Sequence, residues 1–583
     1  RANGCGCPIR IWRRMAVGFM EVSFKGRQKS AGCFSCLPMT RHFTLQYLPL
    51  LPLNIFKMRR FPVSLFLLNA VLSGYIFILN GWANRDLAGI AASVWGALAL
   101  FAIGSLFTLL PKWLFKLFWT LNLLAAAIAV FSRGQYNIFI SEDILLSLLT
   151  VESELTAEMV SLPFIAFTVL LGIVPAVLLW RTPVAPQTWK RRAALAVAGA
   201  VLGGLAVGGI FQWKGYTFRS KGSIRDSRFM TDIFHFSPLD VYVNGQRAYK
   251  AARNLRKNYA HVEILSQKYQ YQSNNDDLLL VFVIGESTRG DRFSLNGYGR
   301  NTNPQLSQIP NLYSFKHAQS CDTLTIHSVH CLASPMLKSS PDRTPRQSSF
   351  GEVLHSLGYH TEIYALQSLS EFYKYLNYDK LVSKHQIVAE QQTGAWDAAL
   401  LPYARQAIGQ YRGGKTLLVL HTLGSHQTYA DRISPQFQVF KPYCTNPDVS
   451  KCSKTELDNA YDNTVLGVDN LLADVIRHLT QSGKKALLFY VSDHGESLGE
   501  NGDYFHGKPV AVAPKEQFSV PFVVWFSDEY RQTPEGAALA QRVAEAANSD
   551  KAVSHDHIFH SVLGCAGVVS PNGGIDDKLN LCH

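Results

Sequence analysis

The chain has 583 residues, enough for about two to four domains, and 47% of them are hydrophobic against 17% charged. This composition excludes a disordered or collagen-like protein. The formal net charge is +13, but residues 1–60 hold 11 basic residues against one acidic residue, so the remainder is close to neutral. No folded segment shows the basic and aromatic clustering that nucleic-acid binding requires, so we expect no nucleic-acid partner.

Residues 1–57 differ in character from the rest of the chain. The sequence opens with Arg1, whereas Met58 followed by two arginines makes a natural start directly before the first apolar run. We therefore expect residues 1–57 to be a non-native or dispensable leader. Cys33 and Cys36 form a lone C-x-x-C there, which is weak evidence for a metal or redox site without a second pair.

Residues 58–213 predict a membrane domain of five helices. A helix needs about 20 apolar residues to cross a bilayer core, and one signal peptide would not produce five such runs. The third run is short and needs Lys112 and Lys116 to snorkel. None of the runs contains Asp, Glu, Lys, Arg or His. This argues against a transporter or sensor, because ionisable residues within the spans would mark a path through the membrane. The runs are 61–83, 87–111, 117–132, 159–180 and 193–213.

The charges of the loops predict the orientation. Basic residues precede the first run and separate runs two and three and runs four and five, whereas the stretch 142–158 is acidic. Short cytoplasmic loops carry an excess of Lys and Arg, so we expect everything after residue 213 to lie outside the cytoplasm. Residues 214–276 are expected to be an interfacial linker, with a helical stretch around 241–269 that lies on the bilayer.

Six of the ten cysteines lie in this outer segment, in three close sequential pairs. Six cysteines allow 15 connectivities, of which the spacing favours sequential pairing. Disulfides persist in oxidising compartments, so the cysteines agree with the charges about location. Six buried free thiols are the alternative. The expected disulfides are Cys321–Cys331, Cys444–Cys452 and Cys565–Cys582.

Residues 277–583 predict an α/β domain with a mostly parallel central sheet. Short apolar runs alternate with helical segments, and fully apolar strands are typical of sheets buried on both faces. Ligand sites in such sheets form at the carboxyl ends of the strands. The expected strands are 278–284, 360–366, 416–422, 485–491 and 520–526.

Metal-binding residue types follow three of these strands. Glu286 follows the first strand, Asp493 and His494 follow the fourth, and His426 lies just beyond the third. Carboxylate and imidazole groups that converge at one sheet edge match the ligands of zinc, with manganese as the next candidate.

A hydroxyl-rich segment lies between Cys321 and Cys331. A short disulfide loop is a rigid way to present one alcohol, and metal coordination makes an alcohol an effective nucleophile. Thr323, Thr325 and Ser328 are the candidates, and helix N-capping is the alternative role for any of them.

Four ordered motifs together resemble the lipopolysaccharide phosphoethanolamine transferases of the alkaline phosphatase and sulfatase-like superfamily. The resemblance covers roughly residue 58 to the C-terminus. It implies five membrane helices before a periplasmic catalytic domain in the bacterial inner membrane. The motifs are GESTR at 285–289, CDTLTIHSVHC at 321–331, SDHGES at 492–497 and FHGKPVAVAPKEQ at 505–517.

The resemblance also implies roles for the site residues. Thr325 falls on the family's nucleophile and is also a zinc ligand, together with Glu286, Asp493 and His494. His426 and His506 fall on residues that bind the transferred phosphoryl group or a second zinc ion. One Zn²⁺ is thus expected to be tightly bound. The implied donor is phosphatidylethanolamine, a membrane lipid, and the implied acceptor is lipopolysaccharide.

Departures from the family pattern bear on the acceptor. Members that modify lipid A typically have Gly after the first cysteine of the loop and Pro-Cys-Met around the second, where this chain has Asp322 and His330-Cys331-Leu332. With the segment from Ser570 to Cys582, these residues favour the inner-core sugars Kdo or heptose as acceptor. A lipid A phosphoethanolamine transferase, a glycerol-phosphate transferase and a sulfatase remain the enzymatic alternatives, although a sulfatase signature is missing.

Overall fold

The computed structural model describes residues 62–583 except for 85–86, 151–160, 214–235, 260–261, 264–267, 272–276, 341–342, 392–395, 447 and 550–551. The expected leader, residues 1–57, and about half of the expected linker lie outside the described residues.

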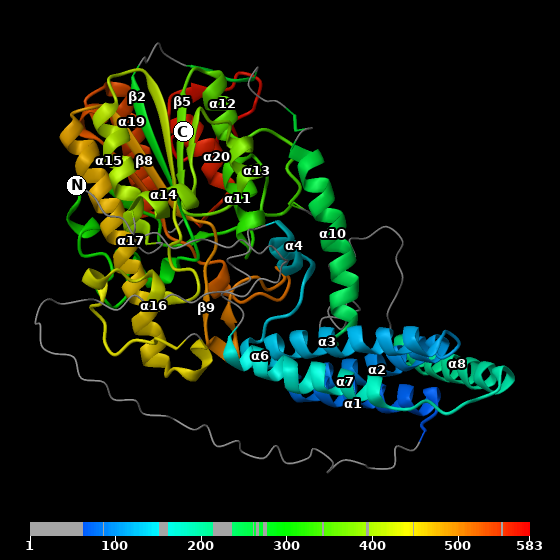
Figure 1. Ribbon diagram of the computed structural model, residues 1–583. Coiled ribbons are helices and arrows are strands. Elements are labelled where there is room, and N and C mark those ends of the chain that lie inside the picture. Colours follow the sequence, from blue (N-terminus) through cyan, green and yellow to red (C-terminus); the bar gives the residue numbers. More distant parts are fainter. Residues whose placement is uncertain are drawn as a thin grey trace, which may run out of the picture. The chain divides into compact units, whose positions relative to one another are not determined.

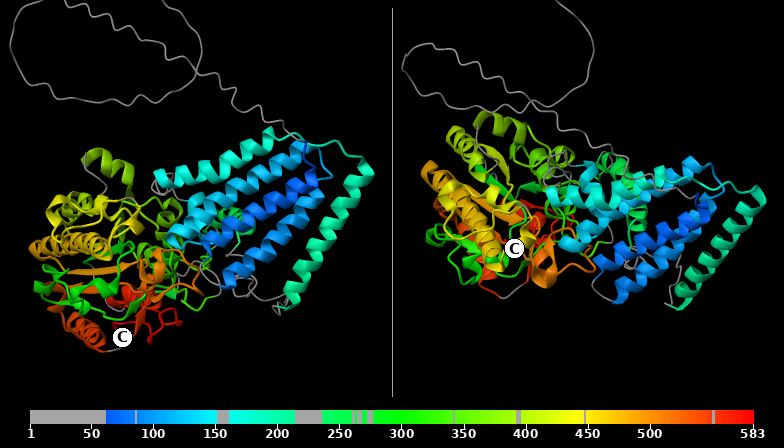
Figure 2. Two further views of the ribbon diagram at one scale, coloured as in Figure 1. Left: turned by 90° about the horizontal axis from the view of Figure 1, so that it is seen from below. Right: turned by 60° about the horizontal axis from the view of Figure 1, so that its bottom comes forward.

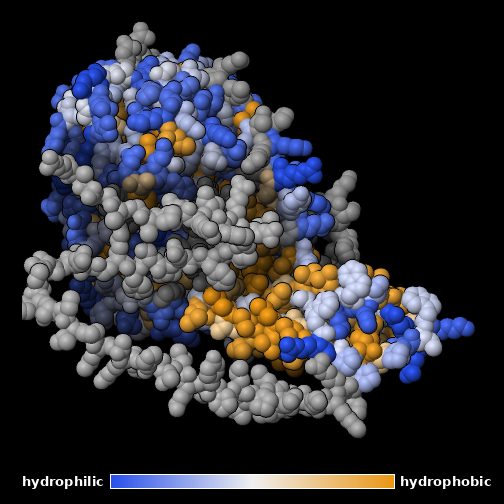
Figure 3. Space-filling model, viewed as in Figure 1, coloured by the Kyte–Doolittle hydropathy of each residue, from blue (hydrophilic) through white to orange (hydrophobic). Residues whose placement is uncertain are grey.

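Five helices are long and apolar enough to cross a membrane, as predicted. They run side by side in both views of Figure 2, and α2 packs against α1 and α8. Their outer surfaces are rich in exposed apolar side chains (Figure 3), such as Ile78, Leu170 and Leu205. The spans are α1 (Leu65–Ala83), α2 (Leu87–Phe107), α3 (Lys112–Tyr136), a fourth built from α6 (Leu162–Thr168), the π-helical η1 (Val169–Ile173) and α7 (Val174–Arg181), and α8 (Trp189–Trp213).

The third span is longer than the short run of the sequence prediction. Helix α3 has 25 residues, and the predicted uncharged run 117–132 lies within it, directly between Lys116 and Arg133. Lys116 is buried and donates to the backbone oxygens of Trp180 and Thr182 at 3.0 and 2.9 Å. The ammonium therefore caps the end of a neighbouring helix instead of snorkelling to water.

Two helices outside the spans pack against each other, namely α4 (Glu142–Thr150) and α10 (Leu239–Tyr259). Helix α10 corresponds to the helical stretch expected around 241–269, although it ends ten residues earlier. The segment just before α10 is joined to the membrane helices, because Asn80 of α1 bonds the backbone of Ser237 in both directions, at 2.7 and 2.8 Å. The expectation that α10 lies on a bilayer surface stays a prediction.

A seven-stranded sheet forms the centre of the remaining part, in the order β3-β11-β8-β2-β7-β5-β6. All five predicted strands are present, and β2 pairs in parallel with β7 and β8. The sheet is mixed, because β11 runs antiparallel to both β8 and β3. The strands are β2 (Leu278–Gly285), β3 (Leu312–Ser314), β5 (His360–Ala365), β6 (Lys380–Val382), β7 (Lys415–His421), β8 (Ala486–Ser492) and β11 (Phe522–Phe526).

Both faces of the sheet are buried, as its apolar strands predict. Leu280 and Phe282 of β2 pack with one group of helices, whereas Val281 and Val283 pack with the other, since successive side chains of a strand point to opposite faces. Figure 1 shows the sheet between these layers. The first group includes α11 (Thr325–Ala333), α12 (Phe350–Ser356), α13 (Ser370–Leu376), α19 (Pro534–Asn548) and α20 (Asp556–Cys565), and the second α15 (Leu401–Gln410) and α17 (Lys454–Ser482).

Smaller elements complete the domain. The further helices are α14 (Lys384–Gln391), α16 (Tyr429–Arg432) and α18 (Asp528–Arg531). Three two-stranded pairs lie outside the main sheet, formed by β1 (Gln270–Tyr271) with β13 (Val568–Val569), β9 (Ser497–Leu498) with β10 (Tyr504–Phe505), and β4 (Ala318–Gln319) with β12 (Val553–Ser554).

The cysteines of this part pair in sequence order, as the spacing predicts. The disulfides are Cys321–Cys331, Cys444–Cys452 and Cys565–Cys582. The first closes a loop that carries the three candidate hydroxyls and includes the start of α11, in which Thr325 and Ser328 lie.

Candidate active site

The candidate ligands gather at the carboxyl edge of the sheet. Glu286 follows β2 and Asp493 follows β8, and these two strands are parallel neighbours, so both carboxylates emerge side by side. Both are fully buried, as is His494. The Nε2 atom of His494 lies 3.5 Å from Glu286 Oε1 and 3.3 Å from Asp493 Oδ2. The three residues can offer ligand atoms that all lie within 4.8 Å of one another.

Local backbone geometry fixes the direction of these side chains. Ser287 has φ 53°, a conformation that costs energy for a residue with a side chain and is typical of functional turns. Its amide donates to Asp493 Oδ1 at 3.0 Å, and its hydroxyl donates to Glu286 Oε1 at 2.7 Å. The turn after β2 thus ties the first carboxylate to the second.

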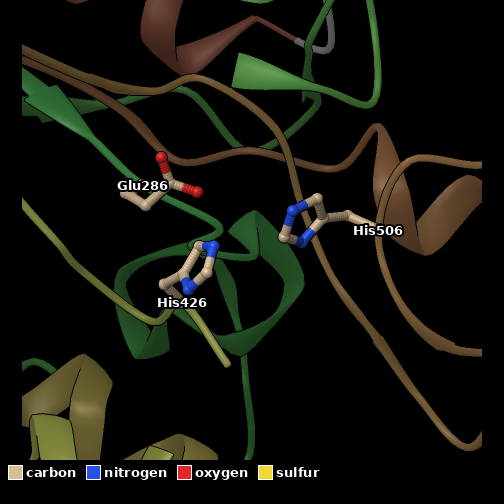
Figure 4. A group of neighbouring side chains, drawn as sticks. All are labelled: Glu286, His426 and His506. Carbon is tan, nitrogen blue, oxygen red and sulfur yellow. The ribbon is translucent and has the colours of Figure 1, made fainter. Parts of the chain in front are cut away.

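His426 and His506 come from two further segments and point into the same space as Glu286 (Figure 4). The three residues offer ligand atoms within 4.8 Å of one another. The His506 ring centre lies 4.3 Å from that of His494 and 5.3 Å from that of His426. One cluster thus contains every metal and phosphoryl ligand that the sequence suggested.

The three candidate hydroxyls of the Cys321–Cys331 loop have different environments. Thr323 donates to the backbone oxygen of Lys508 at 2.7 Å, and Ser328 donates to that of Asp322 at 3.1 Å. Thr325 instead faces the cluster. Its Oγ1 donates to Glu286 Oε2 at 3.1 Å and lies 3.2 Å from His494 Nε2.

Helix capping does not explain Thr325. The N-cap of α11 is Leu324, which offers no side-chain cap, and Thr325 is the first helical residue. Because α11 begins there, the hydroxyl leaves the first turn toward the sheet edge. Half-buried Thr325 is thus the hydroxyl of the turn that the fold places among the ligands.

Burial and mutual repulsion set the charges of the cluster. The pKa of Glu286 is raised well above its usual value, first by burial and then by the neighbouring Asp493. Two buried carboxylates so close cannot both ionise comfortably unless a cation lies between them. Burial lowers the pKa of His494, and it lowers that of His426 well below the usual value, so both imidazoles are neutral and able to bind a metal.

The cluster fits a zinc ion. Its donors are carboxylate oxygen, imidazole nitrogen and a hydroxyl, the ligand types that Zn²⁺ accepts. The Oδ2 atom of Asp493 is buried and has no hydrogen-bond partner among the described residues. His494 Nδ1 lies 2.9 Å from the backbone oxygen of Gly495, which fixes the proton there and leaves Nε2 as the ligand atom.

Two supporting residues carried no role in the sequence interpretation. Glu496 is fully buried, accepts from Tyr429 Oη at 2.7 Å, and lies 2.6 Å from His506 Nδ1. Burial alone would lower the pKa of His506, but Glu496 holds it above its usual value. Gln367 donates to Glu286 Oε2 at 2.9 Å. Gln367 directly follows the second predicted strand. The rule that identified the other candidates, a polar residue just after a strand end, therefore also selects Gln367.

The loop that carries His426 is held by a further carboxylate, which is half-buried. Asp397, at the start of the 3₁₀ turn Asp397–Leu400, accepts from the backbone amides of Leu423 and Gly424 at 2.8 and 3.1 Å. Gly424 has φ +49°, and a Cβ atom there would lie 2.2 Å from the backbone oxygen of Glu286. A glycine is therefore required where this loop crosses the end of β2.

Two family descriptions match the chain. Residues 97–226 match the family described as phosphoethanolamine transferase EptA/EptB, and residues 279–568 match the sulfatase family. The two matches cover part of the membrane helices and nearly all of the α/β domain.

Individual relatives agree with these matches. The Kdo(2)-lipid A phosphoethanolamine 7''-transferase of Escherichia coli K12 is 33% identical over 493 residues, which are 79% of this chain and 85% of that protein. Phosphoethanolamine transferase EptA of Helicobacter pylori is 27% identical over 80% of this chain and 84% of that protein.

A solved structure shares the whole fold. The integral membrane protein lipooligosaccharide phosphoethanolamine transferase A (EptA) from Neisseria meningitidis superposes with a TM-score of 0.76 at 24% identity, over 89% of this chain and 98% of that one. The superposition therefore includes both the membrane helices and the sulfatase-like domain. Together with the identity and coverage of the Escherichia coli relative, it shows that this chain is a multi-pass membrane enzyme of the phosphoethanolamine transferase family.

Proposed function

We propose that this enzyme transfers phosphoethanolamine from phosphatidylethanolamine to the inner core of lipopolysaccharide through a covalent intermediate on Thr325. One observation carries the proposal. Of the three hydroxyls in the Cys321–Cys331 loop, that of Thr325 contacts the buried cluster. Its Oγ1 lies 3.1 Å from Glu286 Oε2 and 3.2 Å from His494 Nε2. We infer that the transferred group is phosphoethanolamine because the relatives are named for that transfer.

Zinc is the proposed cofactor. Glu286, Thr325, Asp493 and His494 would hold one ion, and His426 and His506, which lie beside them, would hold the phosphoryl oxygens or a second ion. A bound Zn²⁺ lowers the pKa of a ligand hydroxyl and neutralises charge on phosphoryl oxygens.

The first step forms a bond between Thr325 Oγ1 and phosphorus and breaks the bond between phosphorus and the diacylglycerol oxygen. Glu286 Oε2 accepts the hydrogen bond of Thr325 and is the acceptor for its proton. His506, whose pKa is held above the usual value by Glu496, protonates the leaving diacylglycerol. The products are diacylglycerol and phosphoethanolamine-threonine.

The second step reverses these roles. A sugar hydroxyl of the acceptor attacks phosphorus, and the bond to Thr325 breaks. His506, now neutral, takes the proton of the sugar hydroxyl, and Glu286 returns a proton to Thr325. Phosphoethanolamine ends on the sugar, and the protein returns to its starting state.

The acceptor is proposed to be Kdo or heptose of the inner core. The Escherichia coli relative that is 33% identical is named for a Kdo(2)-lipid A acceptor. Asp322, one of the residues that depart from the pattern of the lipid A enzymes, forms an ion pair with Arg343 at 3.1 Å. Lipid A is the alternative acceptor, and a glycerol-phosphate transferase is the alternative activity.

The catalytic domain lies on the periplasmic side of the bacterial inner membrane. The distribution of basic loops and the three disulfides support this placement. Because the donor and the acceptor are both membrane lipids, the membrane helices confine the enzyme and its substrates to one surface.

Mass spectrometry of lipopolysaccharide from cells with and without the gene tests this proposal. We expect a mass increment of one phosphoethanolamine on the fragment that contains the inner-core sugars, and no increment in cells that carry Thr325→Ala. A phosphoethanolamine increment on the lipid A fragment would show that lipid A is the acceptor. A glycerol-phosphate increment would show that the enzyme is a glycerol-phosphate transferase.

A further inference from the structure

His555 lies in the interior of the α/β domain, outside the cluster of candidate ligands. It directly precedes α20, and 1% of its surface is exposed. Strand β12 ends at the residue before it and pairs in parallel with β4, and the backbone amide of His555 donates to the oxygen of Gln319 at 3.1 Å. The pairing of these two short strands therefore brings His555 beside the segment that leads into the Cys321–Cys331 loop.

The imidazole of His555 joins two segments of the candidate active site. Its Nδ1 atom accepts from the backbone amide of Cys321 at 3.4 Å, and its Nε2 atom lies 3.0 Å from the backbone oxygen of Ser492. Because a backbone amide can only donate, Nδ1 carries no proton, and Nε2 therefore carries the proton and donates to Ser492. Burial lowers the pKa of His555 to about 4, so the ring is neutral and keeps this arrangement.

Each of the two segments carries one part of the proposed chemistry. Ser492 ends β8 and directly precedes Asp493, one of the candidate metal ligands. Cys321 opens the disulfide loop and lies four residues before Thr325. One buried ring thus connects a strand that ends in a ligand with the segment that carries the proposed nucleophile.

The backbone of Thr323 ties the same loop to a different part of the site. Its oxygen accepts from the amide of Gly507 at 3.0 Å, and Gly507 directly follows His506. This bond joins the loop to the segment of His506, whereas His555 joins it to the end of β8. The loop is therefore held at two points, and each point belongs to a different segment that carries a candidate ligand.

We propose that His555 is a positioning residue, which holds the start of the Cys321–Cys331 loop against the end of β8 and so sets the distance from Thr325 to the ligand cluster. In the structure, Thr325 Oγ1 lies 3.1 Å from Glu286 Oε2 and 3.2 Å from His494 Nε2. A misplacement of about 1 Å costs on the order of 100-fold in rate at such a site. This inference rests on the proposed function, since it gives His555 a role in placing the proposed nucleophile.

Substitutions that keep one end of the bridge test this role in the full-length enzyme. An asparagine side chain offers an acceptor oxygen near the position of Nδ1, and a glutamine side chain offers a donor nitrogen near that of Nε2. His555→Asn thus keeps the contact to Cys321, and His555→Gln keeps the contact to Ser492. His555→Ala loses both contacts.

Stability and turnover should respond differently to these variants. Tm should fall most in His555→Ala and recover in part in His555→Asn and His555→Gln, because each of these satisfies one buried polar group again. A bridge with one end holds nothing together, so kcat should stay about 100-fold below that of the unmodified enzyme in all three variants. The KM for phosphatidylethanolamine and the zinc content should be nearly unchanged. If His555→Ala does not fold, the other two variants carry the same test.

His560→Ala is the matched control. His560 lies on α20 and is also buried, but its Nδ1 atom accepts from the backbone amide of Asp576, at 3.1 Å, in the C-terminal segment. Its loss leaves a backbone amide without its partner, as the loss of His555 does. His560→Ala should therefore lower Tm but leave kcat nearly unchanged.

The outcomes separate the two proposals. A kcat that recovers together with Tm in His555→Asn or His555→Gln would overturn the positioning role, while the transfer reaction stands. A loss of kcat in His560→Ala as large as that in His555→Ala would overturn it as well. An unmodified enzyme that forms no phosphoethanolamine adduct from phosphatidylethanolamine would overturn the proposed function and this inference together.

Discussion

The membrane helices and the carboxyl edge of the sheet both bury polar side chains, but the partners of those side chains differ. In the helices, Asn69 donates to the backbone oxygen of Phe101 at 2.9 Å, and Lys116 donates to that of Trp180 at 3.0 Å. Each donor is used to join one helix to another. At the sheet edge the buried groups face one another instead, and Asp493 Oδ2 accepts no hydrogen bond from the described residues.

This difference distinguishes buried polar groups that hold helices together from buried polar groups that can bind a ligand. A buried polar group that is matched to a backbone partner stabilises packing and has no capacity left for a ligand. A cluster of acids and imidazoles has such capacity, and within it burial and then the neighbouring Asp493 raise the pKa of Glu286. Variants in the two regions should therefore have different effects. Variants in the membrane helices should lower stability, whereas variants at the sheet edge should lower the transfer activity.

The largest effect is expected at Thr325. Thr325→Ala should reduce transfer by more than about 1,000-fold, because the covalent route loses its nucleophile, whereas Thr325→Ser should keep part of the activity. Incubation with phosphatidylethanolamine and no acceptor, followed by peptide mapping, should place a phosphoethanolamine adduct on Thr325. Thr323→Ala and Ser328→Ala are matched controls within the same turn, and an adduct on either residue would reassign the nucleophile.

Loss of metal is the next effect in size. Glu286→Gln should lower the zinc content of the purified full-length enzyme well below one ion per chain, since the variant removes an anionic ligand. Elemental analysis measures the content, and Glu456→Gln at the start of α17 should leave it unchanged. Full zinc occupancy in Glu286→Gln would contradict the ligand assignment.

A smaller effect is expected at Glu496, which supports His506 without belonging to the nucleophile turn. Glu496→Gln should lower transfer about 10- to 100-fold, as for other partners of ligand histidines. The carboxylate holds the pKa of His506 above its usual value, so activity that needs protonated His506 falls as pH rises through that pKa. In Glu496→Gln this fall should shift to lower pH.

Tyr429→Phe is the graded control for Glu496, since it removes one hydrogen bond to the carboxylate but keeps the charge. The pH profile should then stay close to that of the unmodified enzyme. An unshifted profile in Glu496→Gln would show that His506 does not carry the titrating proton.

The smallest effect on chemistry is expected from the helices. Asn80 accepts from Arg133 at 2.7 Å and bonds the backbone of Ser237, so it joins α1, α3 and the segment before α10. Asn80→Ala should cost about 1–3 kcal/mol of stability by leaving buried groups unsatisfied, with little change in kcat. Thermal unfolding in detergent measures this. Asn122→Ala, whose amide donates within its own helix to Phe118, should cost less.

The main strands were predictable from the sequence to within one or two residues, because buried parallel strands are continuous apolar runs. Phe522–Phe526 was predicted as a strand, but its antiparallel direction was not, since an apolar run carries no direction. The edge strands β3 and β6 were missed, because three residues are too few to form a pattern.

The candidate site was predictable in residue type and less so in detail. Glu286, Asp493 and His494 follow directly from the ends of apolar strands. Spacing alone could not choose among the three hydroxyls, because the choice depends on where α11 begins. Lys116 was misjudged for a related reason, since its partners lie on a helix more than sixty residues away.

The disulfide Cys321–Cys331 links the timing of activity to the route of the chain through the cell. The cytosol keeps thiols reduced, so this turn stays open until the domain has crossed the membrane. Closing a loop of this size is worth about 2–4 kcal/mol, which is enough to decide whether Thr325 is held in place. Oxidation after export therefore completes the turn that holds the proposed nucleophile only once the domain has left the cytosol.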